Sequence, residues 1–296
     1  MTKLENFVLS NPKYQALGES ADKKAVQAVL DEITDEVLAG LTSDEICRHV
    51  QEVYDVTVDE YIKNPHNQYV IDELIEFMDM LSGGSDVFDL GCGTGRDALF
   101  MACTNTDYRK SQMRRVSHGK STLEKFSIPA KYFRVVAIDT ALKMLETARQ
   151  KEQELRNNNL LTPWPYMFPL FTCEDMHNVD LQLFGPFDGI WSCTALFTHT
   201  PRALVEKSMR SVADALKSGG IFFASYTSGR VDGRYNKLLL SSTGRIKYFS
   251  QPDPDLITKI ASDHGLKLEK ESFSDFEVGG KVLKKDLFVS QFFRKI

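Results

Sequence analysis

A glycine-rich turn between an apolar run and a helical pattern constrains this chain of 296 residues more than any other feature. The apolar run Val87–Leu90 predicts a buried strand, and a helical pattern begins at about Arg96. Between them, glycines stand at alternate positions: Gly91, Gly93 and Gly95. Glycine has no Cβ and tolerates positive φ, so such a turn can bring backbone N–H groups close to a ligand. The stretch predicts a nucleotide-sized cradle, although a strand, turn and helix without a ligand would show the same pattern.

The spacing of this turn separates two kinds of nucleotide-binding protein. The dinucleotide fingerprint G-x-G-x-x-G would need a third glycine where this chain has Arg96, which disfavours a nicotinamide oxidoreductase. Asp89 instead begins the pattern D-x-G-x-G-x-G, which resembles the first motif of the class I S-adenosylmethionine (SAM) methyltransferases. The resemblance implies that Asp89 and the three glycines hold the cofactor. Arg96 could pair with the carboxylate of SAM or of a substrate, or Asp97 could neutralise it.

A second strand over Phe133–Asp139 ends in an acidic residue. A carboxylate at Asp139 suits the two ribose hydroxyls of a nucleoside, because it can accept both hydrogen bonds. Asp139 lies 44 residues after Gly95, and the usual separation is about 20 residues, so we expect an insertion at about 105–131. The insertion is basic, with eight Lys or Arg from Arg109 to Arg134. A solvated loop is favoured over a patch that binds an anionic substrate or nucleic acid.

The segment after Asp139 resembles two further motifs of the same family. The run D-x-x-x-x-M-L-x-x-A-R at 139–149 predicts a helix with Thr140 as its N-cap, beside the cofactor. A third strand over 170–173 leads into the run from Glu174 to Val179, which resembles D-A-E-N-L. The resemblance implies that Asp175 accepts from the adenine amino group and that the Met176 N–H faces the ring. Glu174 competes with Asp175, and His177 falls at an exposed, variable position.

Strand and helix patterns alternate from residue 86 to residue 226. A fourth strand over 187–196 ends in small residues around Cys193, where a ligand could approach. Thr200 is the expected N-cap of a helix over 201–216, and a fifth strand follows at 221–226. Two closing strands at 266–273 and 287–293 include a final antiparallel strand at the sheet edge. The chain therefore predicts an α/β fold with a doubly wound, mostly parallel, seven-stranded Rossmann-like sheet.

The resemblance extends from Tyr54 to the C-terminus, through motif runs at 89–97, 187–196 and 232–235. It predicts a methyltransferase domain over 54–296, and residues 1–53 form a helical extension that is a cap, a dimer interface or added core. Tyr54 and Tyr61, seven residues apart, fall on one helical face. They either fill the core or, as the resemblance implies, Tyr61 covers SAM as part of a lid.

Composition restricts the partners of the chain. The net charge of −5 does not favour binding to polyanions, so nucleic acid is an unlikely partner. Five scattered cysteines without C-x-x-C spacing argue for a reducing compartment and against a metal site. No signal-peptide core or membrane-spanning run is present, so we expect a soluble cytoplasmic protein with no membrane partner. A homodimer is left open.

The resemblance implies methyl transfer from SAM to an O, N or S atom of a small molecule by SN2 displacement. His199 is the candidate base for a hydroxyl or protonated amine, although one extra residue precedes it relative to the family pattern. Arg234 and Tyr235, after the fifth strand, are candidate substrate contacts. The alternatives are a methyltransferase for protein or RNA and a non-catalytic SAM-binding protein.

Overall fold

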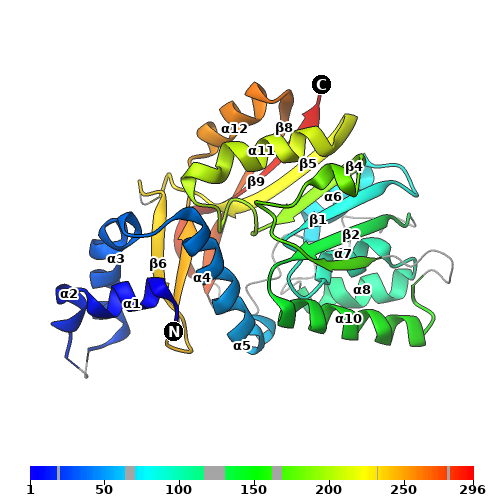
Figure 1. The fold of residues 1–296 in the computed structure, drawn as a ribbon. Coiled ribbons are helices and arrows are strands. Elements are labelled where there is room, and N and C mark those ends of the chain that lie inside the picture. Colours follow the sequence, from blue (N-terminus) through cyan, green and yellow to red (C-terminus); the bar gives the residue numbers. More distant parts are fainter. Residues whose placement is uncertain (19–20, 64–70, 117–130, 162–168, 232, 279–280) are drawn as a thin grey trace.

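A seven-stranded sheet forms the centre of the computed structural model, which describes residues 1–18, 21–63, 71–116, 131–161, 169–231, 233–278 and 281–296. The strand order is β3-β2-β1-β4-β5-β9-β8 (Figure 1). The strands are β1 (Asp86–Leu90), β2 (Arg134–Asp139), β3 (Leu170–Cys173), β4 (Phe187–Cys193), β5 (Leu216–Thr227), β8 (Leu266–Val278) and β9 (Lys281–Lys295). β1 to β5 pair in parallel, and β9 is antiparallel to both β5 and β8. The predicted fold class is confirmed.

The last strand differs from the prediction in its position. β9 was expected at the sheet edge, but it lies between β5 and β8, and the edge strands are β3 and β8. Phe292 and Phe293 explain this place, because both are fully buried and they belong to hydrophobic clusters on opposite faces of the sheet. A strand that is apolar on both faces needs cover on both sides, which an interior position supplies.

Helices cover both faces of the sheet (Figure 1). One hydrophobic cluster joins the sheet to α6 (Ile71–Met80), α7 (Arg96–Ala102) and α10 (Leu142–Asn157), with α8 (Thr106–Val116) next to α7. The other cluster joins it to α11 (Val205–Ala215) and α12 (Pro254–Asp263). Two short 3₁₀ helices, η2 (Leu181–Leu183) and η3 (Arg202–Leu204), lie in connections. The carboxyl ends of the parallel strands therefore stay open for a ligand site.

Three local expectations are corrected. Thr140 is not an N-cap, because α10 begins at Leu142 and the Asp139 carboxylate accepts the Ala141 N–H at 2.9 Å. Thr200 does not cap α11 either, since η3 precedes that helix. His177 is buried rather than exposed, and its Nδ1 lies 3.1 Å from the Ser208 hydroxyl.

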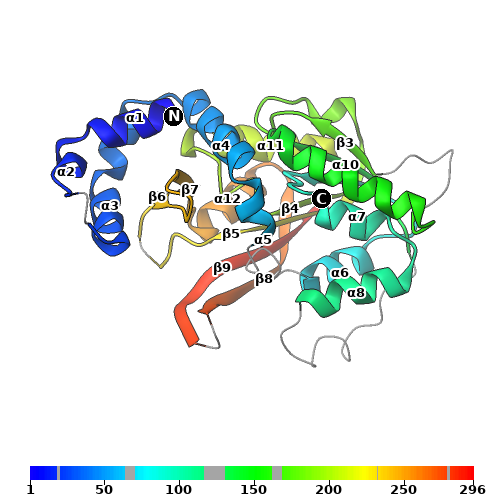
Figure 2. The same cartoon turned by 90° about the horizontal axis from the view of Figure 1, so that it is seen from below.

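A separate group of elements packs beside the carboxyl ends of the strands, and we call it the lid. It comprises α1 (Lys3–Ser10), α2 (Pro12–Gln15), α3 (Lys23–Ala39), α4 (Ser43–Val56), α5 (Val58–Lys63) and the hairpin of β6 (Asn236–Leu240) and β7 (Ile246–Ser250). A third hydrophobic cluster contains residues of α1, α3, α4 and both hairpin strands, and Figure 2 shows the hairpin beside these helices. The predicted boundary at residue 53 therefore does not separate two packing units.

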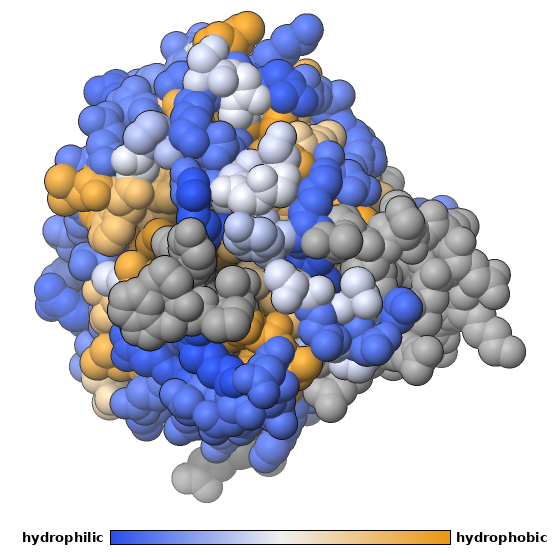
Figure 3. Space-filling model, turned by 90° about the vertical axis from the view of Figure 1, so that its right-hand side faces the viewer, coloured by the Kyte–Doolittle hydropathy of each residue, from blue (hydrophilic) through white to orange (hydrophobic). Residues whose placement is uncertain are grey.

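The surface opposite the lid is mixed in character. On the face in Figure 3, hydrophilic residues cover most of the visible surface, and hydrophobic residues form small groups between them. Within the described ranges, no helix is long and apolar enough to cross a membrane.

Candidate active site

A large cavity lies between the sheet and the lid. Its volume is about 770 Å³, and a smaller cavity of about 240 Å³ adjoins it through shared lining residues. The core wall comes from the glycine turn and the ends of β2, β4 and β5. The lid wall comes from α3, α4, α5, β6 and β7. The cavity thus stands at the carboxyl ends of parallel strands, where α/β folds bind their ligands.

The three glycines of the turn have different neighbours. Gly91 and Gly93 line the cavity with φ of +80° and +52°. A Cβ on Gly91 would lie 2.3 Å from the Cβ of Ala195, so no side chain fits there. Gly95 (φ +73°) is not among the lining residues, and its Cβ would lie 2.8 Å from Ala148 and from the Phe171 ring. Gly95 was predicted to bind cofactor, but the close packing of α7 on α10 and β3 is what requires glycine there.

The acidic and basic residues around the turn form a buried network behind it. Asp89 is 2% exposed and does not line the cavity. Burial, with the negative charge of Asp97 beside it, raises the pKa of Asp89. Arg96 makes a two-pronged ion pair with Asp97 at 2.6 and 2.9 Å, and Asp97 also accepts the Trp191 Nε1–H at 2.9 Å. Of the two roles considered for Arg96, the structure shows the internal salt bridge. Asp89 is buried near this ion pair, and its Oδ2 has no hydrogen-bond partner among the described residues.

Asp139 faces the cavity at the end of β2. One carboxylate oxygen accepts the Gly93 N–H at 2.8 Å and the other accepts the Ala141 N–H at 2.9 Å. Burial raises its pKa, and these N–H groups act in the opposite direction. Each oxygen keeps a further lone pair, so the carboxylate can also accept from ligand hydroxyls. Thr140 lines both cavities beside it.

The loop after β3 divides its residues between the two cavities. Glu174 and Met176 line the large cavity, whereas Asp175 lines the smaller one. Met176 and Thr140 line both. The Asp175 carboxylate accepts the His177 N–H at 2.9 Å and the amide of Asn178 at 2.7 Å, which stabilises the turn. Both acidic candidates therefore stay open, on adjoining walls.

Two tyrosines and a cysteine complete the wall near the glycines. The Tyr61 hydroxyl would lie 3.4 Å from a Cβ on Gly93, and Tyr61 and Cys193 both line the cavity. Tyr54 also lines it, and its ring meets the Tyr61 ring edge-on at 6.1 Å. The two tyrosines belong to separate helices, α4 and α5, rather than to one helical face. Burial raises the pKa of the Cys193 thiol to about 12, so the thiol is protonated at neutral pH.

His199 lines both cavities and has two polar partners. Its Nδ1 lies 3.2 Å from the Tyr248 carbonyl oxygen. A carbonyl only accepts, so Nδ1 carries the proton and Nε2 has the lone pair that accepts from the Tyr54 hydroxyl at 3.0 Å. Burial lowers the pKa of His199 to about 4, so the ring is neutral at pH 7. A proton from a substrate would reach Nε2 through the Tyr54 hydroxyl or after its displacement.

The two predicted substrate contacts lie elsewhere. Arg234 is exposed and donates to the Asp31 carbonyl of α3. The Tyr235 hydroxyl donates to the Thr200 carbonyl at 3.0 Å, and its ring packs under the Arg202 guanidinium at 5.7 Å. Neither residue lines the cavity. Both predictions were wrong because the chain enters β6 directly after them and turns these side chains toward other elements.

Sequence reasoning missed most of the lid wall. Its polar members include Gln27, Gln51, Glu60, Lys237 and Lys247, and its apolar members include Leu239 and Phe249. Gln251 after β7, and Leu287 and Phe288 of β9, complete the cavity beside it. The alternation of apolar and polar residues over 236–250 was the available signal, since it is the pattern of a hairpin. Among the described residues, no cluster of three His, Cys, Asp or Glu is placed to hold a metal ion.

Comparisons with known proteins agree with this architecture. The model of a methyltransferase domain family matches residues 116–224. The fold is similar to 1,6-didemethyltoxoflavin-N1-methyltransferase from Burkholderia thailandensis, solved with S-adenosylhomocysteine, with TM-score 0.53, 13% identity and coverage of 86% of this chain and 91% of that one. It is similar also to a TehB-like SAM-dependent methyltransferase from Corynebacterium glutamicum, with TM-score 0.50, 15% identity and coverage of 81% and 99%. The chain has the fold of the SAM-dependent methyltransferases, and its residues 116–224 match the methyltransferase domain family.

The CcbJ methyltransferase from Streptomyces caelestis has the same fold, with TM-score 0.50, 16% identity and coverage of 81% of this chain and 96% of that one. The sequence matches no curated protein. The matched domain family and the similar structures point to SAM as the cofactor, and the geometry of the cavity fits it. The free lone pairs of Asp139 suit the ribose hydroxyls of SAM, and Gly91 and Gly93 bring bare backbone to the cavity wall beside it.

Proposed function

We propose that this methyltransferase moves the methyl group of SAM to an O, N or S atom of a small molecule by in-line displacement. The observation that carries the proposal is the one cavity that runs from the glycine turn to the lid. Its volume of about 770 Å³ lies within the range of about 300–1,000 Å³ that small-molecule sites occupy. Because α3, α4, α5 and the hairpin line the same cavity as the glycines, a substrate has to fit beneath the lid.

The proposed cofactor site combines the cavity residues of the core. The amino-acid part of SAM lies against Gly91 and Gly93 on the cavity wall, and Asp139 accepts from the ribose. Glu174 or Asp175 accepts from the adenine amino group. The remaining contacts come from Tyr61, Thr140, Met176 and Cys193, all on the wall of the large cavity. Gly95, Asp89 and Arg96 act indirectly, by holding the turn and α7 in place.

The chemistry that SAM supplies when bound is a methyl group already activated on a sulfonium, so the protein's main task is alignment. We assign Tyr54 as the group that faces the substrate and His199 as the residue that orients it. With its proton directed to Nε2, the Tyr54 oxygen offers lone pairs to a substrate N–H or O–H. A low pKa of about 4 makes His199 a weak base, which favours substrates that need little proton removal.

The alternative of a protein or RNA substrate rested on the basic insertion, and the structure removes several of its charges from a binding role. Arg109 is fully buried and donates to the Phe100 and Met101 carbonyls at the end of α7. Lys131 donates to the Leu81 carbonyl after α6 at 2.9 Å. The part of the insertion at 117–130 lies outside the described residues. A small-molecule substrate, without nucleic acid, is the better proposal; a homodimer stays a prediction.

Calorimetry on the full chain tests the proposal. We expect SAM and S-adenosylhomocysteine to bind and NAD not to bind. Asp139→Asn keeps the shape but weakens its acceptance from ribose hydroxyls, so affinity should fall about tenfold. The control is Asp263→Asn, an exposed aspartate at the end of α12. Equal affinity of Asp139→Asn and wild type would refute the ribose assignment.

The substrate class is tested with labelled SAM. Extracts fractionated into small molecules, RNA and protein are incubated with the enzyme, and the label is followed. Label in the small-molecule fraction alone supports the proposal. Label in RNA or protein would instead support the alternative.

A further inference from the structure

The short helix α5 lies beside the glycine turn, although it buries no side chain fully. It continues from the end of α4 (Figure 1), and the carbonyl of Thr57 between the two helices accepts the Tyr61 N–H at 3.0 Å. The Tyr61 hydroxyl reaches the turn, where it would lie 3.4 Å from a Cβ on Gly93. A helix of six residues without a fully buried side chain has little packing to keep it in place. Polar contacts with other elements are therefore needed to keep Tyr61 at the turn.

Glu60 supplies such contacts between α5 and the hairpin. Its Oε1 accepts the Ser242 N–H at 3.1 Å and the Ser242 hydroxyl, in the turn between β6 and β7. Its Oε2 lies 3.4 Å from the Nζ of Lys247 in β7. Burial by itself raises the pKa of Glu60, but the hydrogen bonds of Ser242 and the charge of Lys247 outweigh it, so the pKa lies below its ordinary value of 4.5. The carboxylate is charged at neutral pH, and we call its contacts with Ser242 and Lys247 the latch.

The hairpin is the fixed side of the latch. The Ser250 N–H at the end of β7 donates to the Thr198 carbonyl at 2.8 Å, and the Ser250 hydroxyl accepts the Thr200 N–H at 3.0 Å. Both strands of the hairpin also contribute buried residues to the hydrophobic cluster of α1, α3 and α4. Moving the hairpin would break these bonds and expose that cluster. A movement of α5 about Thr57 breaks the latch and leaves these other contacts intact.

The latch stands on the wall of the large cavity, next to the proposed cofactor site. Glu60, Tyr61 and Lys247 line that cavity, as do Gly91 and Gly93. Glu60 and Tyr61 are neighbours on the same short helix. A movement of α5 that opens the latch therefore also withdraws Tyr61 from the glycine turn and uncovers a cofactor bound there.

We propose that Glu60 is a positioning residue that controls exchange of the cofactor: the latch holds Tyr61 at the glycine turn, and its opening admits SAM and releases S-adenosylhomocysteine. The inference rests on the proposed cofactor site. The latch is closed in this structure, so entry and release both require it to open. Loss of Glu60 therefore accelerates both steps, whereas loss of a residue that only contacts the cofactor changes mainly release.

The test measures both rate constants for S-adenosylhomocysteine on the full-length protein by surface plasmon resonance. Glu60→Ala removes the latch and should raise the dissociation rate constant about tenfold or more. It should raise the association rate constant about threefold or more, because more of the free protein is open. Glu60→Gln keeps an oxygen that accepts from Ser242, so its dissociation rate constant should stay within about threefold of wild type.

A double-mutant cycle tests whether Glu60 acts through Tyr61. Tyr61→Leu alone should accelerate dissociation, because it removes the side chain that reaches the turn. Adding Glu60→Ala to Tyr61→Leu should then change the dissociation rate constant by less than about twofold. An increase as large as the one in the wild-type background would show that the two residues act independently, and would overturn the proposal.

The control is Glu52→Ala, the same change at an exposed glutamate of α4. It should leave both rate constants within about twofold of wild type. Thermal unfolding of every variant is recorded first, so that the rate constants are compared between folded proteins.

The outcomes separate the two proposals. If wild type does not bind S-adenosylhomocysteine, the proposed function and its cofactor site fail. If wild type binds it but Glu60→Ala releases it at the wild-type rate, the inference about the latch is overturned and the cofactor site stands. Slower or unchanged association in Glu60→Ala would overturn the latch as well.

Discussion

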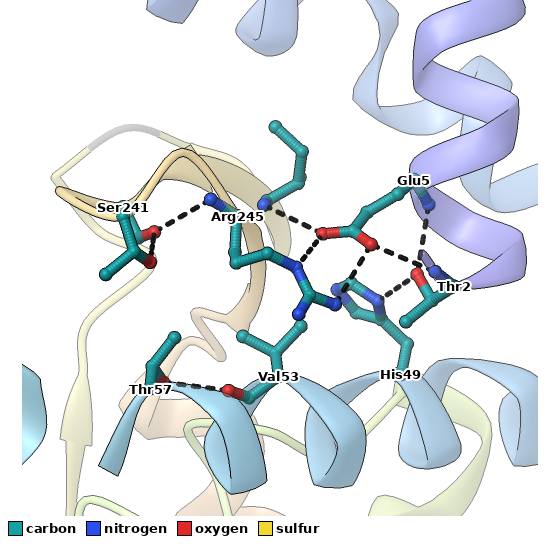
Figure 4. Close-up of polar contacts among 9 residues, drawn as sticks. Thr2, Glu5, His49, Val53, Thr57, Ser241 and Arg245 are labelled. Atoms are coloured by element: carbon teal, nitrogen blue, oxygen red, sulfur yellow. Dashed lines mark hydrogen bonds and ion pairs between the residues drawn. The ribbon is translucent and has the colours of Figure 1, made fainter. Parts of the chain in front are cut away.

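A buried ion pair joins the first helix of the lid to its hairpin, and its removal should destabilise the lid. Glu5 of α1 accepts from the Nε of Arg245 at 2.6 Å and from its Nη2 at 3.0 Å (Figure 4). The same carboxylate accepts the N–H groups of Thr2 at 2.9 Å and Ile246 at 3.4 Å. The Glu5 side chain is 6% exposed and that of Arg245 is 24% exposed. Four donors thus converge on one carboxylate that connects α1 with β7.

The substitution Glu5→Gln removes the charge and turns one accepting oxygen into a donor. Losing one partner of a fully buried ion pair costs about 3–5 kcal/mol. Water reaches part of Arg245, so we expect a loss of about 2–3 kcal/mol in the free energy of unfolding, measured by urea titration. The midpoint of thermal unfolding should fall by about 5–10 °C. Amide hydrogen exchange should rise in α1 and β7 and stay unchanged in β1 and β4.

The control is an ion pair of the same length on the surface of two other lid helices, α2 and α3. Lys13 and Glu32 lie 2.6 Å apart, but their side chains are 52% and 59% exposed. Glu32→Gln should change the free energy of unfolding by less than about 0.5 kcal/mol. Equal effects of the two substitutions, or an effect of Glu5→Gln below about 0.5 kcal/mol, would refute the assignment of a buried, lid-fastening pair.

The pH dependence of this effect has a definite sign. Burial by itself raises the pKa of Glu5, but the hydrogen bonds and charge of Arg245 and the N–H groups of Thr2 and Ile246 outweigh it, so the pKa lies below its ordinary value of 4.5. A carboxyl with a lowered pKa in the folded state stabilises above its unfolded pKa and loses that contribution as pH falls through the folded pKa. The difference in free energy of unfolding between wild type and Glu5→Gln should have its full size at pH 7 and should shrink below about pH 4.5.

Two further predictions concern the core. Gly95→Ala should lower the free energy of unfolding by about 2–4 kcal/mol, because the added Cβ would clash with α10 and β3 and because φ is positive there. The control is Gly84→Ala, where φ is +81° but the space is open. It should lose only about 1 kcal/mol. A smaller loss at Gly95 than at Gly84 would contradict the packing argument. Arg109→Leu should lower the free energy of unfolding by about 2 kcal/mol or more, because it leaves buried carbonyls unpaired. The substitution Lys110→Leu at an exposed neighbour should not, and thermal unfolding measures both. If Arg109→Leu is as stable as wild type, Arg109 becomes a candidate for the basic binding patch again.

The sheet and the cofactor turn were predictable because their signals are local. Buried parallel strands appear as short apolar runs, and acidic residues at their ends, such as Asp139, stand where a nucleoside can be bound. The glycine turn could be predicted from the sequence, but the structural reason for glycine at each of its positions could not. Gly91 and Gly95 look alike in the sequence, and only the approach of Ala195 to one and of Phe171 to the other distinguishes them.

The lid was not predictable, because its contacts join residues that are far apart in the chain. Helical periodicity over 21–41 shows that one face of α3 is buried, but not that Leu238 and Tyr248 of the hairpin cover it. The predictions for Arg234 and Tyr235 failed for the same reason, since contacts between distant segments cannot be predicted from local sequence. Their position after β5 suggested a ligand contact, and the entry into β6 turned them toward α3 and Thr200 instead.

His199 connects the lid to the chemistry, and this coupling follows from hydrogen-bond direction alone. Its Nδ1–H is committed to the Tyr248 carbonyl, which belongs to β7, and its Nε2 accepts from Tyr54, which belongs to α4. If the hairpin moves away, the Nδ1–H loses its acceptor and the ring is free to adopt the other tautomer, in which Nε2–H cannot accept from Tyr54. The Tyr54 oxygen then no longer offers fixed lone pairs to a substrate. The N-terminal helices and the hairpin at 236–250 together therefore fix the hydrogen-bond direction of Tyr54, the group that we propose faces the substrate.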